Sequence, residues 1–262
     1  MEDKSVTVSA TSSPQSSKSI ASMNCDKSVT ETVTGEKSTM KVYLTNGTFQ
    51  IVKYGDATDI RGIVQLLTSR LSSDSSQRRF EGCYGIRLIN TLNRDEVYWL
   101  HHDLGVMQVM HEHRNKSEDW RYELRIRYMP SSLSDLLSKD CVTFHYLYDQ
   151  LKNDYLALTA NVELETAILL CCLEIRRYFK DISHFALDKK SNFEYLDKEI
   201  GLHKLLPSTV LSSVKRKVLR KAIQSQFRKV STLDEIDCML RFIDLLQSLL
   251  KFKEESFKCA LG

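Results

Sequence analysis

Alternating apolar and polar positions predict a β-hairpin in the first strongly patterned stretch of the chain. From Val42 to Tyr54, apolar residues recur on both sides of Asn46-Gly47 with the two-residue spacing of a strand that buries one face. Asn and Gly both tolerate the positive φ angles that a tight hairpin turn requires. The stretch therefore predicts two antiparallel strands joined at Asn46-Gly47.

A helix and three further strands are predicted after this hairpin. Apolar residues from Ile60 to Leu71 lie three or four positions apart, which favours a helix, and Asp56 is a suitable N-cap before it. Short alternating segments predict strands around residues 84–88, 97–99 and 124–128. A hairpin, a helix and further strands in this order indicate a ubiquitin-like β-grasp lobe, which we assign to residues 39–130.

From residue 131 onward the apolar period is helical. The spacing from Phe144 to Leu158 predicts one helix, and the nearly all-apolar run Ala167–Leu173 predicts a buried central one. Capping-box spacing predicts two further helix starts, and the last helix is expected to bury an apolar stripe. The capping pairs are Ser191 with Glu194 and Thr232 with Glu235, and the stripe is Ile236, Leu240, Ile243 and Leu250. We therefore predict an all-helical bundle over residues 131–253, and an α+β fold class.

The two ends of the chain differ from these lobes. Residues 1–38 are rich in Ser, Thr and Lys and offer little apolar surface to offset the entropy of ordering, so we expect a disordered tail. Within residues 254–262, Phe257, Cys259 and Leu261 alternate, which we interpret as the start of a strand in a further lobe. We accordingly expect the protein to continue beyond Gly262.

A basic stretch within the helical half is the main candidate for function. No Asp or Glu occurs from Ile200 through Leu233. Read as one helix, the stretch places Val210, Leu211, Val214, Val218 and Ala222 on a buried face and its cations on the opposite arc, with Lys215 beside that arc. The members of this basic cluster are Lys215, Arg216, Lys217, Arg220 and Lys221.

Two interpretations of the basic cluster remain open. Most Lys and Arg residues on an amphipathic helix are simply its solvated face. The density of one sign without interleaved carboxylates favours an external anion instead. That anion is a lipid head group, an acidic or phosphorylated protein segment, or nucleic acid.

Composition indicates a globular protein of the cytosol. Hydrophobic residues make up 42% of the chain and charged residues 27%, while the net charge is only +3, so the basic signal is local. Seven cysteines occur without Cys-x-x-Cys spacing, as expected for reduced thiols. The longest apolar run is far shorter than the roughly 20 residues of a membrane span, and the N-terminus lacks a signal-peptide core.

No motif for catalysis or metal binding is complete. The sequence contains no Gly-rich phosphate loop, no Gly-x-Ser-x-Gly and no His-Glu-x-x-His. His101-His102 and His111-Glu112-His113 lack further ligands at metal spacing, and neither Cys83 nor Cys171 has an identified base. We therefore expect a binding module without catalytic residues, metal or cofactor.

Five long, non-repetitive strings between Tyr54 and the C-terminus carry a resemblance to one protein family. They are Gly55-Asp-Ala-Thr-Asp-Ile-Arg-Gly62, Glu123-Leu-Arg-Ile-Arg-Tyr128, Cys172-Leu-Glu-Ile-Arg-Arg177, Lys189-Lys-Ser-Asn-Phe193 and Ser256-Phe-Lys-Cys-Ala-Leu-Gly262. With these strings in the same order, the chain resembles the FERM domains of focal adhesion kinases. Residues 1–38 and 72–79 find no counterpart in the resemblance.

The resemblance implies the first two lobes of a three-lobed FERM domain, the second resembling acyl-CoA-binding protein. In focal adhesion kinases this region inhibits the tyrosine kinase domain of the same chain, and a basic patch that binds phosphoinositide membrane helps to release it. That patch aligns with Lys215–Lys221, where Arg216 replaces Ala and Val218 replaces Thr. ATP and Mg would belong only to the kinase domain, outside these residues.

The same alignment identifies a surface expected to dock on the kinase. A Tyr, a Met and a Val of the family fall at Phe179, Ile182 and Tyr195, which remain apolar or aromatic but are not identical. From the residues alone, these three would be expected to pack inside the lobe.

The resemblance implies a cytoplasmic regulator at the plasma membrane and focal adhesions. Its expected partners are its own kinase domain, anionic phosphoinositide membrane, and integrin or growth-factor receptor tails, in integrin and adhesion signalling. An alternative is a FERM adaptor that links membrane receptors to the cytoskeleton without a kinase. A third interpretation, a helical nucleic-acid binder, is the least expected of the binding modules.

Overall fold

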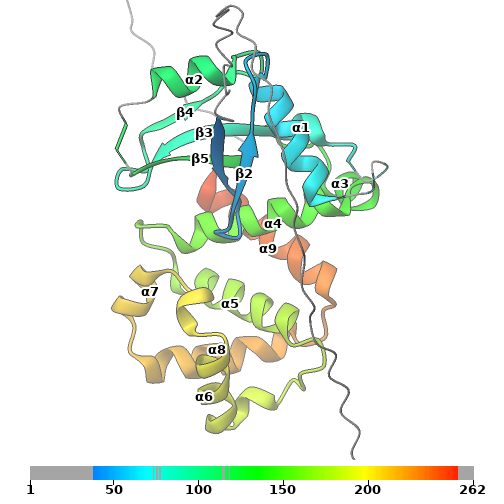
Figure 1. The fold of residues 1–262 in the computed structure, drawn as a ribbon. Coiled ribbons are helices and arrows are strands. Elements are labelled where there is room, and N and C mark those ends of the chain that lie inside the picture. Colours follow the sequence, from blue (N-terminus) through cyan, green and yellow to red (C-terminus); the bar gives the residue numbers. More distant parts are fainter. Residues whose placement is uncertain are drawn as a thin grey trace, which may run out of the picture. The chain divides into compact units, whose positions relative to one another are not determined.

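The computed structural model describes residues 38–252 apart from 73, 75, 77, 114, 115 and 118 (Figure 1). A five-stranded sheet with its helices comes first in the chain, and a helical lobe follows, so the predicted α+β class is confirmed. The tail predicted before residue 38 and the strand predicted over residues 254–262 lie outside the described residues.

The predicted hairpin is confirmed. Strands β1 (Thr39–Tyr43) and β2 (Phe49–Lys53) pair antiparallel. Gly47 has a φ of 81°, in the left-handed region that glycine adopts without steric cost. The Asn46 side chain accepts a hydrogen bond from the Thr48 N–H at 3.0 Å, which further fixes the turn.

The remaining strands complete a mixed sheet in the order β2-β1-β5-β3-β4. They are β3 (Tyr84–Asn90), β4 (Val97–Trp99) and β5 (Trp120–Ile126). β5 runs parallel to β1 and antiparallel to β3. Because side chains alternate along a strand, one face of the sheet is apolar and contributes to the core with helix α1 (Ile60–Leu71).

Two helices in this lobe differ from the sequence analysis. α1 is capped by Asp59, whose side chain accepts from the Gly62 N–H at 2.7 Å, and not by Asp56. Helix α2 (Val106–Glu112) was not predicted, because its only buried residues, Val106 and Val109, are too few to show a helical period.

The second lobe is helical, and its central helix is buried as predicted. Helix α5 packs against α8 and α9, and all its residues from Ala167 to Leu173 except Leu169 are buried. The helices are α3 (Leu133–Lys139), α4 (Cys141–Leu156), α5 (Leu164–Tyr178), α6 (Lys190–Glu199), α7 (Ser208–Ser213), α8 (Arg216–Val230) and α9 (Glu235–Leu250).

Both predicted capping boxes are wrong. α6 begins at Lys190 with no side-chain cap, so Ser191 lies inside its first turn. α9 is capped by Asp234, which accepts from the Asp237 N–H at 2.7 Å, because the helix starts at Glu235, three residues after Thr232. The shift also rotates the buried stripe of α9, which consists of Cys238, Met239, Phe242, Ile243 and Leu246 and shares only Ile243 with the predicted one.

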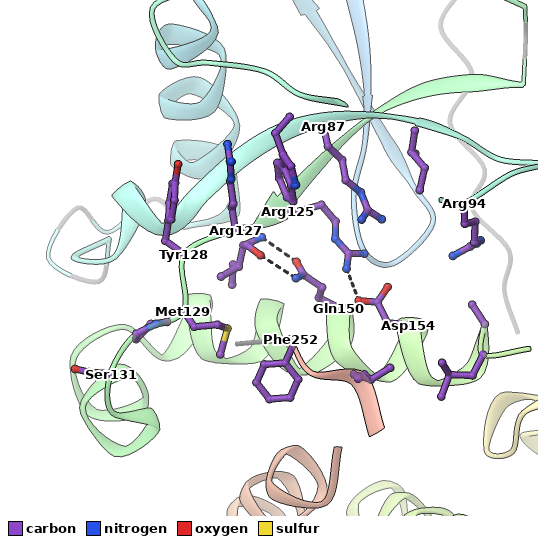
Figure 2. Close-up of a pocket in the computed structure, with 17 residues that line it drawn as sticks. Arg87, Arg94, Arg125, Arg127, Tyr128, Met129, Ser131, Gln150, Asp154 and Phe252 are labelled. Carbon is purple, nitrogen blue, oxygen red and sulfur yellow. Dashed lines mark hydrogen bonds and ion pairs between the residues drawn. The ribbon is translucent and has the colours of Figure 1, made fainter. Parts of the chain in front are cut away.

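β5 extends past the end of β1, and side chains of α4 bind the β5 backbone where β1 no longer pairs with it. The pairing of β1 with β5 ends at Tyr43, so no described strand lies beside Leu124 and Ile126 on that side. Gln150 of α4 accepts from the Ile126 N–H at 2.8 Å and donates to the Ile126 carbonyl at 3.0 Å (Figure 2). The Tyr146 hydroxyl donates to the Leu124 carbonyl at 2.8 Å. These bonds satisfy buried backbone groups that would otherwise be costly.

A buried carboxylate joins α4 to α5. Glu174 of α5, whose side chain is 3% exposed, pairs with Lys152 of α4 and with Arg177, and accepts a hydrogen bond from the Tyr148 hydroxyl. Burial raises the pKa of Glu174, but the two cations outweigh burial and hold the pKa below its ordinary value of 4.5. The charged form of Glu174 therefore stabilises the fold.

The substitution Gln150→Leu should lower the free energy of unfolding by about 2 to 4 kcal/mol. It leaves the Ile126 N–H and carbonyl buried without partners, and each such group costs about 1 to 3 kcal/mol. Urea denaturation followed by circular dichroism measures the change. The control Gln65→Leu, at an exposed position of α1, should stay within about 0.5 kcal/mol of the unchanged protein. Equal stability of the two variants would contradict this role for Gln150.

Glu174 should also govern part of the loss of stability in acid. Its folded pKa is depressed, so its contribution is present above the unfolded value of 4.5 and is lost as the pH falls through the folded pKa. Glu174→Gln should cost about 3 kcal/mol at pH 7 and flatten the decline below pH 4.5. Unfolding curves across pH measure both effects. The exposed Glu165→Gln is the matched control on the same helix, and an unchanged acid profile in Glu174→Gln would refute the assignment.

Candidate functional site

The basic cluster lies at the junction of two helices, not on one. α7 ends at Ser213 and α8 begins at Arg216, with Val214 and Lys215 in extended conformation between them. The single helix predicted for this stretch is therefore wrong. The break places Lys215 at the N-cap of α8 and puts Arg216 and Lys217 in its first turn.

The break also changes which apolar residues are buried. α8 buries Leu219, Ile223, Phe227 and Val230, which recur at helical spacing. Val218, predicted to face the core, is 49% exposed because it lies one position before this stripe. Val210 is buried, while Leu211, Val214 and Ala222 are only half-buried. The surface next to the cations thus includes an exposed apolar side chain.

One of the five cations is neutralised within the chain. Arg216 forms an ion pair with Asp197 of α6, a residue just outside the acid-free stretch of the sequence. The side chains of the other four make no ion pair or hydrogen bond with any residue that the structure describes. These four are Lys215, Lys217 and Lys221, which are exposed, and Arg220, which is half-buried.

The helix end adds to the positive field of the cluster. The N-terminus of a helix carries a partial positive charge and unpaired N–H groups, which favour anions. α8 has no acidic residue in its first turn, and Lys215 at the N-cap provides no side-chain cap. Cations at this end therefore repel the helix dipole, and a bound anion would relieve that repulsion.

Contacts along the rest of α8 hold this end in place. Arg228 and Gln224 bind the Asp188 carboxylate at 2.7 and 3.2 Å, and α8 packs along α5 (Figure 1). The Arg228 guanidinium holds the pKa of Asp188 below its ordinary value, so that anchor is charged at neutral pH. Asp188 therefore binds the C-terminal half of α8, away from Lys217 and Lys221.

The three predicted docking residues differ in exposure. Phe179 and Ile182 lie in one turn after α5, are half-buried, and pack against the core. Tyr195 of α6 is 58% exposed. No ring contact joins Tyr195 to Phe179 within the described part of the chain. The structure therefore places only Tyr195 fully at the surface, and the expectation that all three pack inside the lobe is wrong for that residue.

Two exposed aromatic residues near this region were missed. Tyr178 is 60% exposed and Phe185 is 57% exposed. The spacing of Tyr178 from Cys171 and Glu174 places it on the buried face of α5, so periodicity predicts burial. Its exposure is therefore a feature of the fold that no local pattern reveals.

The histidine and cysteine candidates do not form a site. His102 Nε2 lies 3.1 Å from the Tyr84 carbonyl, and His101 lies beside Asp103. The structure brings no three His, Cys, Asp or Glu side chains together as metal ligands among the residues it describes.

Burial raises the pKa values of Cys83 and Cys171, which disfavours a nucleophilic thiolate. The described helices include none with the length and hydropathy of a membrane span.

Family models match most of the chain. Residues 38–130 match the FERM N-terminal domain, and residues 134–257 match the FERM central domain. The myosin VII MyTH4-FERM MF2 domain (mutant 1) of Dictyostelium discoideum has a similar fold, with a TM-score of 0.63 and 19% identity. That similarity covers 82% of this chain and 43% of the myosin chain.

Two relatives align over much of this chain but extend well beyond it. FERM and PDZ domain-containing protein 1 of Mus musculus is 29% identical over 198 residues, which are 75% of this chain and 12% of that protein. Inactive tyrosine-protein kinase kin-32 of Caenorhabditis elegans is 25% identical over 235 residues, which are 85% of this chain and 26% of that protein. The chain therefore spans at most about a quarter of these relatives.

Proposed function

Since the chain belongs to the FERM domain family, we propose that it is the regulatory FERM region of a cytoplasmic tyrosine kinase of the focal-adhesion-kinase type. FERM domains are non-catalytic modules that link membrane to cytoskeleton and bind partner proteins. The finer proposal is that this region inhibits its own kinase domain and is released at phosphoinositide membrane. ATP and Mg would serve that kinase domain only.

The observation that carries the proposal is the set of four cations at the start of α8 that lack carboxylate partners in the described structure. Each cation near an anionic membrane surface contributes on the order of 1 kcal/mol, so four give useful and salt-sensitive binding. Arg216 contributes less, because an anion must compete with Asp197. The exposed Val218 adds apolar surface next to the head groups.

Release requires that membrane and kinase favour different states of the protein. A ligand shifts a conformational equilibrium only through its differential affinity for the two states. In the proposal, Tyr195 with the exposed edges of Phe179 and Ile182 contacts the kinase, and the basic cluster binds lipid better when the kinase is undocked. The similarity to a protein named as an inactive tyrosine kinase supports a kinase context.

An adaptor without a kinase is the second candidate, favoured by the similarity to FERM and PDZ domain-containing protein 1. Reading the gene beyond Gly262 discriminates between them, because a kinase would show a Gly-rich loop and a His-Arg-Asp string. Integrin or growth-factor receptor tails are proposed partners in either case, at the plasma membrane and, for the kinase, at focal adhesions.

The double substitution Lys217→Glu with Lys221→Glu should weaken membrane binding by about 2 kcal/mol or more, roughly thirtyfold, because two attractive charges become repulsive. Sedimentation with phosphatidylcholine vesicles, with and without phosphatidylinositol bisphosphate, measures it. Lys229→Glu, on the C-terminal half of α8, is the matched control. Binding that survives the double substitution would reject the lipid site, and tighter binding to RNA or DNA at equal salt would favour the nucleic-acid interpretation.

Tyr195→Glu should raise basal kinase activity of the full-length protein about fivefold to tenfold, because a charge in an apolar contact disfavours docking. The exposed position makes misfolding a minor concern, whereas Phe179 and Ile182 also support the core. Leu92→Glu, at a side chain 80% exposed in the first lobe, is the control. Unchanged activity in Tyr195→Glu, with stability also unchanged, would contradict docking at this surface.

A further inference from the structure

Two arginines of α8 form ion pairs with acidic residues of other elements, and they are held to different degrees. In the C-terminal half of α8, the Arg228 guanidinium binds Asp188 at 2.7 Å and lies 5.6 Å from the centroid of the Phe185 ring. At the start of α8, Arg216 pairs with Asp197 and makes no further ion pair, hydrogen bond or ring contact with the residues that the structure describes. Arg216 is therefore the more easily released of the two.

The Arg216–Asp197 pair is also open to solvent on the arginine side. The Arg216 side chain is 63% exposed, whereas the Asp197 side chain is 19% exposed. An exposed ion pair contributes little net free energy, because water solvates the separated charges well. Arg216 can therefore leave Asp197 for another anion at small cost.

Asp197 holds a second group with its other carboxylate oxygen. Oδ2 pairs with Arg216, and Oδ1 accepts a hydrogen bond from the Leu202 N–H at 3.1 Å. Asp197 lies in the last turn of α6, two residues after Tyr195. The bonded amide begins the short 3-10 helix Leu202–Lys204. One carboxylate therefore joins α6, the 3-10 helix after it and the start of α8.

A phosphomonoester competes for Arg216 more strongly than another carboxylate does. It carries about −1.5 to −2 charges at neutral pH and three acceptor oxygens, and the guanidinium fork binds two of these at once. Lys217 and Lys221, which have no carboxylate partner in the described part of the chain, attract the same phosphate. A peptide carboxylate has only the charge of Asp197 itself, so it gains little by taking its place.

We propose that a phosphomonoester bound at the start of α8 takes Arg216 from Asp197, and that this exchange transmits anion binding to α6. The inference rests on the proposed function, since it requires the basic cluster to be the anion site. It adds that Asp197 is an internal competitor for that site. Because Tyr195 lies on the same helix, the exchange connects the anion to the element that carries this docking residue.

Isothermal titration calorimetry with inositol trisphosphate tests the exchange on the whole chain. Asp197→Asn keeps an acceptor for the Leu202 N–H but removes the competing charge, so affinity should rise about tenfold. In an Arg216→Gln background the same change should raise affinity only about twofold, because no ion pair has to be broken there. Glu199→Gln removes an equal charge at an exposed position of α6 and should change affinity by less than about twofold.

The Leu202 amide reports the exchange without reference to affinity, because it is bonded to the carboxylate that Arg216 leaves. Two-dimensional NMR should show this amide shifting as inositol trisphosphate saturates the unchanged protein. In Arg216→Gln, where Asp197 has no arginine to lose, most of that shift should disappear.

The outcomes separate this inference from the proposed function. Equal gains from Asp197→Asn with and without Arg216, or a Leu202 amide that does not move at saturation, would overturn the exchange and leave the anion site standing. Absence of binding by all of these proteins would overturn both.

Vesicles that contain phosphatidylinositol bisphosphate form a second arm, which distinguishes a lipid source of the phosphate from a free one. The same dependence on Asp197 and Arg216 on vesicles, with tighter binding than to the soluble head group, supports the exchange at a membrane. Weaker binding to vesicles, with that dependence kept, supports it for a free polyphosphate. Loss of the dependence in both arms would overturn the exchange.

Discussion

The hydrogen bonds between α4 and β5 are the constraint on which the two-lobe structure depends. A strand that is longer than the strand beside it has backbone N–H and C=O groups without partners in the sheet. Here the side chains of Tyr146 and Gln150 of α4 hydrogen-bond to these groups of Leu124 and Ile126. The helical lobe therefore completes the sheet of the first lobe. Directional bonds of this kind fix orientation more closely than apolar contact alone, because each requires a defined distance and angle.

The functional surfaces follow from that constraint. The buried Glu174 of α5 pairs with Lys152 of α4, and α5 packs along α8. A continuous series of contacts therefore connects the sheet to α8, which carries most of the basic cluster. At the start of α8, four of the five cations have no carboxylate partner among the described residues, whereas Asp188 anchors the same helix through an ion pair with Arg228. The same junction pairs Asp154 of α4 with Arg125 of β5.

Local patterns predicted most helices and strands, but not which face of a helix is buried or which residues distant in sequence form contacts. Asn46-Gly47 was sufficient for the hairpin, because the turn chemistry is local. Val218 was placed on the wrong face because a break at two extended residues resets the helix, and periodicity assumes continuity. Asp197 neutralises Arg216 from another helix, which a search of neighbouring sequence cannot find. The strand pattern showed that Arg125 alternates with apolar residues, but its ion pair with Asp154 depends on the fold.

In the proposed function, the fold keeps the start of α8 available to an external anion. The amides of Arg216 and Lys217 lie in the first helical turn and have no intrahelical acceptor, so they report directly on an anion bound there. Two-dimensional NMR with soluble inositol trisphosphate measures their shifts. We expect saturable shifts centred on these two amides and on that of the neighbouring Lys221. Shifts confined to other parts of the chain, or none at all, would contradict it.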